Sequence, residues 1–226
     1  MPRTNRTIRP DRDPVLVIGL GRFGLALAKS LETLEHEVLA VDSRPQVVQR
    51  HANTLTHVVE ADSTDIDAMQ QIGAQDFGRA VVGIGDQIEA SLLTTAVLSD
   101  LAIPEIWAKA ISAEHGRILE RVGAHHVVYP ERAMGERVAH LVTGKMIDFI
   151  EFDDGFAIVK TRPPRESVNR TLAESALRSR YKITVVGTKR PGTDFVYARP
   201  ETLVREGDLL IVCGDTVDCE RFAAVT

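Results

Sequence analysis

The sequence has few cysteines, no long apolar run and no excess of positive charge. Cys213 and Cys219 are the only cysteines, too few for a disulfide framework or a zinc cluster, so a reducing, cytoplasmic setting is expected. The longest apolar runs, such as VLVIG and LLIVC, are far shorter than the roughly 18 to 20 residues that a membrane-spanning helix needs. The net charge of -5 gives no reason to expect a nucleic-acid partner.

The first residues also lack the marks of a targeting segment. The opening MPRTNRTIRPDRDP contains four arginines but no apolar core, which excludes a secretory signal or a lipidation site. We expect residues 1–13 to form a flexible, solvated arm, and a docking role for its arginines is the alternative.

The chain from residue 14 to residue 130 alternates short β-branched runs with amphipathic stretches, which is typical of right-handed βαβ units and a parallel sheet. The predicted strands are 15–19, 37–42, 56–61, 79–85, 105–110 and 125–130. Helices are predicted near residues 23–35, 45–53, 65–73, 87–101 and 113–122. Six such strands make a complete Rossmann-like, doubly wound α/β sheet.

The remainder of the chain has a different pattern. Apolar residues at helical spacing after Pro130 predict a helix that ends near Gly144 and connects two domains, so residues 131–147 form the connecting segment. Residues 148–226 predict a small α+β domain. Two strands flank an Asp-Asp-Gly turn in 149–160, a hairpin surrounds Pro-Gly in 183–197, and 207–214 supplies a last strand. TLAESALRSR and VDCERFAAV supply its helices.

A glycine-rich loop follows the first predicted strand. Gly19, Gly21 and Gly24 form G-x-G-x-x-G at the start of a predicted helix, where backbone amides can face a pyrophosphate. Asp42 ends the second strand and can accept both hydroxyls of an adenosine ribose. Because this carboxylate would repel a 2′-phosphate, the glycine loop and Asp42 together predict that the site binds NAD, ATP or ADP in preference to NADP. Glycines that serve only a strand-to-helix turn are the alternative.

Three further charged residues are candidates for the same site. Asp62 and Lys109 follow the third and fifth strands, at the edge where open α/β sheets bind ligands. Each could line the adenine or a phosphate, or be a solvated charge at a strand end. Arg22 lies inside the glycine loop, where its guanidinium could hold phosphate oxygens or point into water.

A catalytic apparatus is missing from the sequence. No Tyr-x-x-x-Lys, G-x-S-x-G, H-E-x-x-H or P-loop lysine occurs, and the seven histidines are scattered or placed on opposite faces of a strand. An NAD-dependent enzyme would need a proton relay beside its nucleotide. We therefore expect ligand binding without catalysis. A small NAD-dependent oxidoreductase or an NAD(H) redox sensor is the alternative.

Several segments together resemble the regulator of K⁺ conductance (RCK) family of the KtrA and TrkA type. They are GLGRFG, HEVLAVD, DQIEASLLTTAVLSDL, IPEIWAKA, RVGAHHVVYPERAMGERVA and ETLVREGDLLIVCG. The resemblance spans about residues 14–224 and implies an RCK_N domain followed by a smaller RCK_C (TrkA_C) domain. It implies that the chain is a cytosolic regulatory subunit and that its homodimers assemble into an octameric gating ring. The ring docks on a membrane potassium channel or transporter subunit of the KtrB or TrkH type.

The resemblance also implies the ligands. The N-terminal domain of the family binds ATP or ADP, and NAD or NADH in some members, with the glycines at the phosphates, Asp42 at the ribose and Arg22 at the outer phosphate. The predicted nucleotide site thus consists of Gly19, Gly21, Arg22, Phe23, Gly24, Asp42, Asp62 and Lys109.

Two further sites follow from the resemblance. Glu131 matches an acidic residue that binds a divalent cation, Mg²⁺ or Ca²⁺, with its counterpart across a dimer axis; from the residues alone it is an ordinary first-turn acid of a helix. Some members bind cyclic di-AMP in the C-terminal domain. Arg178, Ile183, Val185 and Pro200 lie in the corresponding region, without a distinctive local pattern.

Overall fold

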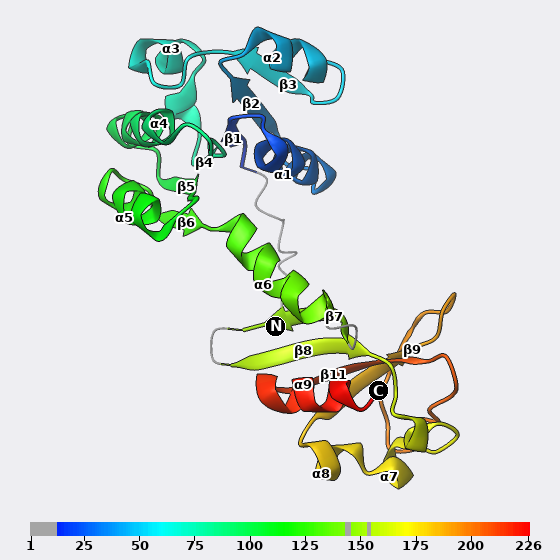
Figure 1. Ribbon diagram of the computed structural model, residues 1–226. Helices are drawn as coiled ribbons and strands as arrows, with labels where there is room; N and C mark the ends of the chain where they lie inside the picture. Colours follow the sequence, from blue (N-terminus) through cyan, green and yellow to red (C-terminus); the bar gives the residue numbers. More distant parts are fainter. Residues whose placement is uncertain (1–12, 143–145, 153–154) are drawn as a thin grey trace, which may run out of the picture. The chain divides into compact units, whose positions relative to one another are not determined.

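The computed structural model describes residues 13–142, 146–152 and 155–226, and Figure 1 shows the order of their elements. The chain divides into two compact units, Met1–Glu131 and Arg132–Thr226. The arm predicted for residues 1–13 lies outside the described residues except for Asp13. No helix in the described ranges is long and apolar enough to cross a membrane.

The first unit is a parallel sheet of six strands with helices on both faces. Its strands are β1 (Val15–Ile18), β2 (Val38–Asp42), β3 (His57–Glu60), β4 (Arg79–Val82), β5 (Glu105–Lys109) and β6 (His126–Val128). Its helices are α1 (Arg22–Thr33), α2 (Pro45–His51), α3 (Ile66–Gln71), the 3₁₀ turn Ala74–Asp76, α4 (Ile88–Asp100) and α5 (Ala113–Arg121). The strand order is β3-β2-β1-β4-β5-β6, and every neighbouring pair is parallel. The predicted doubly wound fold is confirmed.

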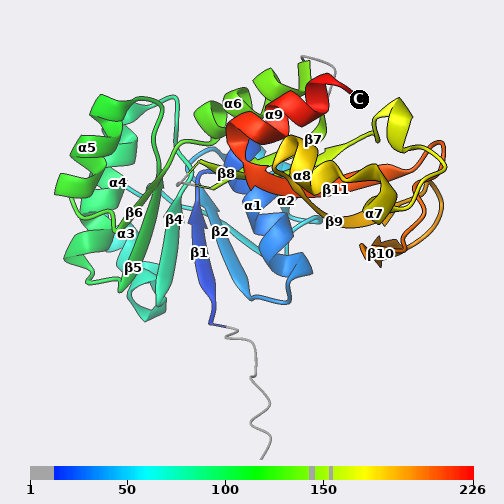
Figure 2. The ribbon, with the colours of Figure 1, turned by 90° about the horizontal axis from the view of Figure 1, so that it is seen from below.

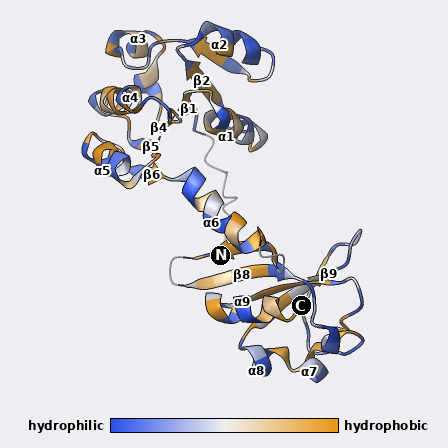
Figure 3. Ribbon diagram, in the orientation of Figure 1, coloured by the Kyte–Doolittle hydropathy of each residue, from blue (hydrophilic) through white to orange (hydrophobic). Residues whose placement is uncertain are grey.

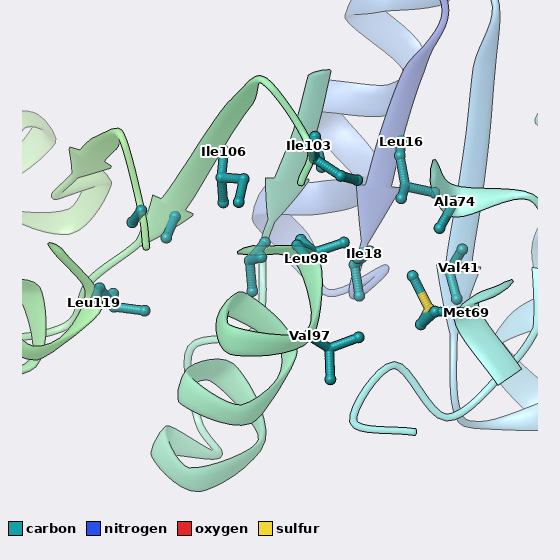
Figure 4. Packing of buried hydrophobic residues seen from close by; sticks show 14 of the residues in the cluster. Leu16, Ile18, Val41, Met69, Ala74, Val97, Leu98, Ile103, Ile106 and Leu119 are labelled. Carbon is teal, nitrogen blue, oxygen red and sulfur yellow. The ribbon is translucent and has the colours of Figure 1, made fainter. Parts of the chain in front are cut away.

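Both faces of the central strand β1 are buried, which explains why β1 is a continuous apolar run. On one face Leu16 and Ile18 of β1 belong to a core shared with α3, α4 and α5. Figure 4 shows Met69 of α3 beside Val41 and Leu98 of α4 beside Ile18. The alternate residues of β1 face α1 and α2 in a second core. Figure 3 accordingly shows hydrophobic and hydrophilic residues on each of α1, α4 and α5.

The sheet changes direction of growth at β1. The chain builds outward from β1 to β3, returns, and then builds outward on the other side from β4 to β6, as Figures 1 and 2 show. The loops after β1 and β4 therefore separate to opposite faces, which opens a crevice at the carboxyl edge of the sheet. This crevice is where a ligand site is expected.

The second unit is a small α+β domain, also as predicted. Its strands are β7 (Met146–Glu151), β8 (Phe156–Thr161), β9 (Thr184–Lys189), β10 (Phe195–Tyr197) and β11 (Leu209–Asp215). Its helices are α7 (Leu172–Ser175), α8 (Leu177–Tyr181), α9 (Thr216–Ala224) and the 3₁₀ turn Arg165–Ser167. The sheet order is β10-β9-β11-β8-β7, with antiparallel pairing throughout. Helix α6 (Pro130–Val142) begins in the first unit and continues into the second.

The core of the second unit forms between α9 and the central strands. Phe222 and Cys219 of α9 are fully buried in a cluster with Leu210 and Val212 of β11. Burial raises the pKa of the Cys219 thiol to about 11, so this thiol is protonated at neutral pH. Its role is packing.

In the second unit, the segment 171–180 differs from the helix that the sequence predicts. The segment 171–180 was predicted as helical throughout, but the structure breaks it into α7 and α8 because Ala176 adopts a left-handed conformation (φ 50°). A capping box between Thr171 and Glu174 fixes the start of α7. The Asp-Asp-Gly turn falls partly on residues 153–154 and the predicted helix end falls on Gly144, both outside the described residues.

Candidate functional site

A cavity of about 730 Å³ opens at the carboxyl edge of the parallel sheet. Its walls come from the loops that follow β1, β2, β3, β4 and β5 and from the start of α6. Of the residues predicted to bind nucleotide or metal, Gly19, Gly21, Arg22, Phe23, Asp42, Asp62, Lys109 and Glu131 line this cavity. Gly24 does not line it. The structure therefore brings residues from distant parts of the sequence to one site.

Each of the three positions in the loop favours glycine for a different physical reason. Gly19 has a φ of +88°, a left-handed conformation that favours glycine. A Cβ on Gly24 would collide with the backbone oxygen of Gly19, so Gly24 allows α1 to pack closely on β1. A Cβ on Gly21 would meet no atom of the described residues within 4 Å. Because no protein group explains Gly21, the open space beside it is available to a ligand.

The start of α1 presents unpaired donors to the cavity. Gly21 is the N-cap residue and provides no side-chain cap, and the first turn contains no acidic residue. The first backbone N–H groups of a helix lack partners within the helix and favour an anion. Arg22 is exposed and makes no ion pair with the described residues. The first turn of α1 thus combines amide donors with an unpaired guanidinium.

Asp42 ends β2, next to the glycine loop that follows β1. Its carboxylate accepts hydrogen bonds from the Leu20 N–H (2.8 Å) and from the backbone and side chain of Arg44. Burial alone would raise the pKa of Asp42, but the hydrogen bonds from Arg44 and Leu20 outweigh it and hold the pKa below its ordinary value. Asp42 is therefore ionised at neutral pH and fixes the glycine loop to β2.

Arg44 is a residue of the site that the sequence reasoning missed. It lines the cavity, and its guanidinium forms a two-pronged ion pair with Asp42 through Nε (2.9 Å) and Nη2 (3.0 Å). The available signal was an arginine two positions after the acidic end of a strand. Arg44 thus bonds both carboxylate oxygens of Asp42, and the predicted contact of Asp42 with the ribose hydroxyls stays a prediction.

Lys109 and Glu131 form a second ion pair in the cavity. The Lys109 Nζ donates to Glu131 Oε1 over 2.6 Å and lies 5.9 Å from the centre of the Phe23 ring. The hydrogen bond from Lys109 holds the pKa of Glu131 below its ordinary value. The Lys109 side chain is 12% exposed and that of Glu131 is 64% exposed. An anion in the cavity would compete with an exposed carboxylate for a largely buried ammonium group.

Asp62 is held by its own loop. Its carboxylate accepts hydrogen bonds from the hydroxyl and the backbone N–H of Thr64, which lower its pKa. The neighbouring Ser63 is buried and bonds to Thr94 of α4 over 2.7 Å. Asp62 therefore lines the cavity as an exposed, ionised residue, and its predicted contact with the adenine stays a prediction.

The donor set at Glu131 is incomplete for a cation within one chain. No group of three or more potential metal ligands occurs among the described residues, and Glu131 is paired with Lys109. A divalent cation there would need carboxylates from a second copy and the departure of Lys109.

The region considered for cyclic di-AMP is divided between core and surface. Ile183 is completely buried in the core of the second unit, whereas Arg178 and Pro200 are exposed. Ile183 is therefore a packing residue, so the four residues do not share one surface.

The strand order and the glycine loop at the crevice between β1 and β4 define a Rossmann-type fold. The TrkA-N domain family model matches residues 15–130, and the TrkA-C domain model matches residues 156–225. The chain therefore belongs to the RCK family, in which a TrkA-N domain is followed by a TrkA-C domain.

Individual relatives agree with this assignment. The chain is 35% identical over 207 residues to Ktr system potassium uptake protein A of Bacillus subtilis, covering 91% of this chain and 93% of the relative. It is 32% identical over 200 residues to the protein of the same name from Vibrio alginolyticus, covering 88% and 90%. The solved GsuK RCK domain has the same fold at a TM-score of 0.66 and 18% identity, over 96% of this chain and 48% of that one. This chain thus spans about half of that solved chain.

Proposed function

We propose that this protein is the cytosolic regulatory subunit of a bacterial potassium uptake system. It binds ATP and ADP in the cavity, with NAD or NADH as a second class of ligand, and controls K⁺ flux through a membrane subunit of the KtrB or TrkH type. The names of its relatives, over nine-tenths of the chain, support the transport role. In this proposal the protein is cytoplasmic and lies at the inner face of the membrane through its partner.

The open space at Gly21 is the observation that carries nucleotide binding. Gly19 and Gly24 are required by the protein's own backbone, but Gly21 is not. A side chain at Gly21 would fill only the space in front of the first turn of α1, beside Arg22. A phosphate chain fits that space, because it would accept hydrogen bonds from the amides and the guanidinium.

The lining of the cavity favours binding over catalysis. Among the described residues that line it, there is no histidine, tyrosine or cysteine, and Lys109 and Glu131, which could transfer a proton, are bound to each other. A hydride-transferring enzyme needs a group that donates or accepts a proton beside the nicotinamide. The oxidoreductase and the NAD(H) redox sensor are therefore second to a regulatory subunit, and substrate-dependent oxidation of NADH by the purified protein would favour the enzyme.

The two cationic side chains near the glycine loop suggest how the outer phosphate is sensed. Arg22 makes no ion pair with the described residues but acts electrostatically on Glu131, and Lys109 is bound to Glu131. A terminal phosphate that binds both Arg22 and Lys109 would release Glu131 from Lys109. Glu131 lies at the start of α6. The remainder of α6 belongs to the second unit. Exchange of one anion for another at Lys109 would thus act on the helix that connects the units.

The size of this effect favours an oligomer. Each charge-assisted hydrogen bond contributes about 1.5–3 kcal/mol, and reversal of a two-state equilibrium from 1:99 to 99:1 takes about 5.5 kcal/mol. Several identical sites in one ring of homodimers, eight subunits in this proposal, would exceed that amount. In such a dimer, two released Glu131 carboxylates could share a divalent cation.

Calorimetric titration of the purified protein with ATP and ADP tests this proposal. Arg22→Ala should weaken ATP binding about 10- to 100-fold and change ADP binding little, because the guanidinium would contact the outer phosphate. Lys29→Ala removes a positive charge from the same helix at an exposed position outside the cavity and should change neither affinity. Equal losses for ATP and ADP would remove Arg22 from the discriminating role.

A flux measurement tests the transport role. Vesicles that contain a KtrB-type membrane subunit should take up Rb⁺ at a rate that depends on added protein and on the ratio of ATP to ADP. A rate that is the same with and without the protein would contradict the proposal.

A further inference from the structure

All hydrogen-bonding positions of the Asp42 carboxylate are occupied. One oxygen accepts the Leu20 N–H (2.8 Å) and Arg44 Nη2 (3.0 Å), and the other accepts the Arg44 N–H (3.0 Å) and Nε (2.9 Å). A carboxylate offers about four lone-pair positions. A ribose hydroxyl could therefore bind to Asp42 only by displacing Arg44.

The Arg44 guanidinium, in contrast, has donors to spare. Of about five N–H groups in a guanidinium, Asp42 takes one from Nε and one from Nη2. The side chain is 55% exposed and lines the cavity, whereas that of Asp42 is 3% exposed. An incoming group at this end of the cavity thus meets N–H donors before it meets carboxylate oxygens.

The charges at this end also differ from what Asp42 alone implies. The ion pair of Asp42 and Arg44 has no net charge, so the repulsion between Asp42 and a 2′-phosphate is largely cancelled. Asp86 also lines the cavity and acts on Arg44 electrostatically, so Asp42, Arg44 and Asp86 together are net negative. The attraction for a 2′-phosphate therefore comes from the free N–H donors of Arg44 and not from the net charge of the group. In Rossmann-type sites an acid here selects the 2′-hydroxyl, and a nearby arginine accommodates a 2′-phosphate.

We propose that Arg44, rather than Asp42, determines specificity at the adenosine ribose, and that the cavity binds 2′-phosphorylated adenine nucleotides of the NADP(H) class more tightly than their unphosphorylated counterparts. The 2′-phosphate takes the remaining N–H donors of Arg44 while Asp42 keeps that side chain in place. This inference rests on the proposed nucleotide site, with the 5′-phosphates at the glycine loop. It reverses the preference expected from Asp42 in the sequence.

A matched pair of ligands isolates the 2′-phosphate. Adenosine 5′-monophosphate and adenosine 2′,5′-bisphosphate differ only in that group, so calorimetric titration with each gives the affinity ratio. We expect the bisphosphate to bind about 10- to 100-fold more tightly. Arg44→Ala should abolish the difference. Arg44→Lys keeps the charge but loses the fork and should retain part of it.

Arg50→Ala is the control for overall charge, because Arg50 is an exposed residue of α2 outside the cavity. It should leave the ratio unchanged. Thermal unfolding of each variant separates loss of binding from loss of the fold, and the wild-type ratio tests the inference even if Arg44→Ala does not fold. Equal or tighter binding of the monophosphate by the wild type would overturn this inference alone, as would an unchanged ratio in folded Arg44→Ala. Failure of every adenine nucleotide to bind would overturn the proposed function with it.

Discussion

The two units of the chain each contain a buried aspartate paired with an arginine, but the pairs have different surroundings. In the second unit, Asp208 accepts from Arg190 Nε over 3.0 Å and from the Arg205 N–H over 2.9 Å. These bonds hold the turn before β11. In the first unit, Asp42 has the same kind of partner but lies in the wall of a cavity.

The difference follows from the direction of the strands. In a parallel sheet all carboxyl ends reach one edge, so residues that follow β1, β2, β3, β4 and β5 converge there. In an antiparallel sheet the strand ends alternate between edges, and polar residues at those ends stabilise separate turns. The same ion pair is therefore structural in one unit and part of a candidate binding site in the other.

The largest expected effect comes from the core of the second unit. Phe222→Ala removes a fully buried ring from α9 and should lower the free energy of unfolding of that unit by about 3–5 kcal/mol. Nucleotide affinity should not change, because the cavity is lined by the first unit. Urea denaturation followed by circular dichroism, together with ATP titration, measures both. Loss of ATP binding in the folded variant would contradict the separation of the two units.

Two glycines of one loop provide the next comparison. Gly24→Ala should lower the free energy of unfolding of the first unit by about 1–3 kcal/mol, because its Cβ would collide with a backbone oxygen. Gly21→Ala should leave stability unchanged and weaken ATP binding. Fluorescence of the single tryptophan, Trp107 of β5, reports unfolding of the first unit. A Gly21→Ala variant that binds ATP normally would argue against phosphates beside that residue.

The Asp42 carboxylate should lose its contribution to stability in acid. Asp42→Asn should lower the free energy of unfolding by about 1–3 kcal/mol at neutral pH. The folded-state pKa of Asp42 lies below its ordinary value of 3.8, so the stability that this carboxylate contributes is complete above that pH and is lost as the pH falls through the lowered pKa. The wild type and the variant should therefore converge on acidification in Trp107-monitored unfolding.

Asp208→Asn is the matched control from the second unit. It should change the stability of the turn at Arg190 without affecting nucleotide binding, whereas Asp42→Asn should affect both properties. An equal effect of the two substitutions on ATP affinity would remove the distinction between the two ion pairs.

The smallest expected effect is at the exposed ion pair. Glu131→Gln removes the carboxylate that binds Lys109. Ion pairs with an exposed partner contribute about 0–1 kcal/mol. ATP affinity should therefore rise by at most about fivefold. Glu114→Gln removes an exposed acid of α5 that pairs with Arg117 outside the cavity and should have no effect. A decrease in ATP affinity for Glu131→Gln would show that Glu131 assists binding directly or through a cation.

The fold of the first unit and the position of its site follow from the local sequence. The ion pairs between side chains in that site do not. Continuous apolar strands, the glycine loop and the acidic end of β2 all predict a parallel sheet with a site at one edge. Whether Asp42 is free or bound depends on the rotamer of Arg44, and the sequence does not fix that rotamer. Lys109 and Glu131 are 22 residues apart, so their pairing depends on β5 and α6 meeting at the same edge.

In the second unit, the feature that the local sequence does not predict is the backbone conformation of Ala176. Ala176 is a strong helix former, yet it adopts φ 50° and separates α7 from α8. Ser175, the last residue of α7, and Leu177, the first residue of α8, are both buried, and the sharp bend at Ala176 between them accompanies this burial. Tertiary packing here overrides a local preference for helix.

Burial of Cys219 has a practical consequence. Since its thiol has a pKa of about 11 and no exposed surface, an alkylating dye at neutral pH should react with the partly exposed Cys213 of β11 instead. The native sequence thus provides one fluorescent donor, Trp107, in the first unit and one labelling position in the second. Energy transfer between them would follow the separation of the units during nucleotide exchange without any engineered residue.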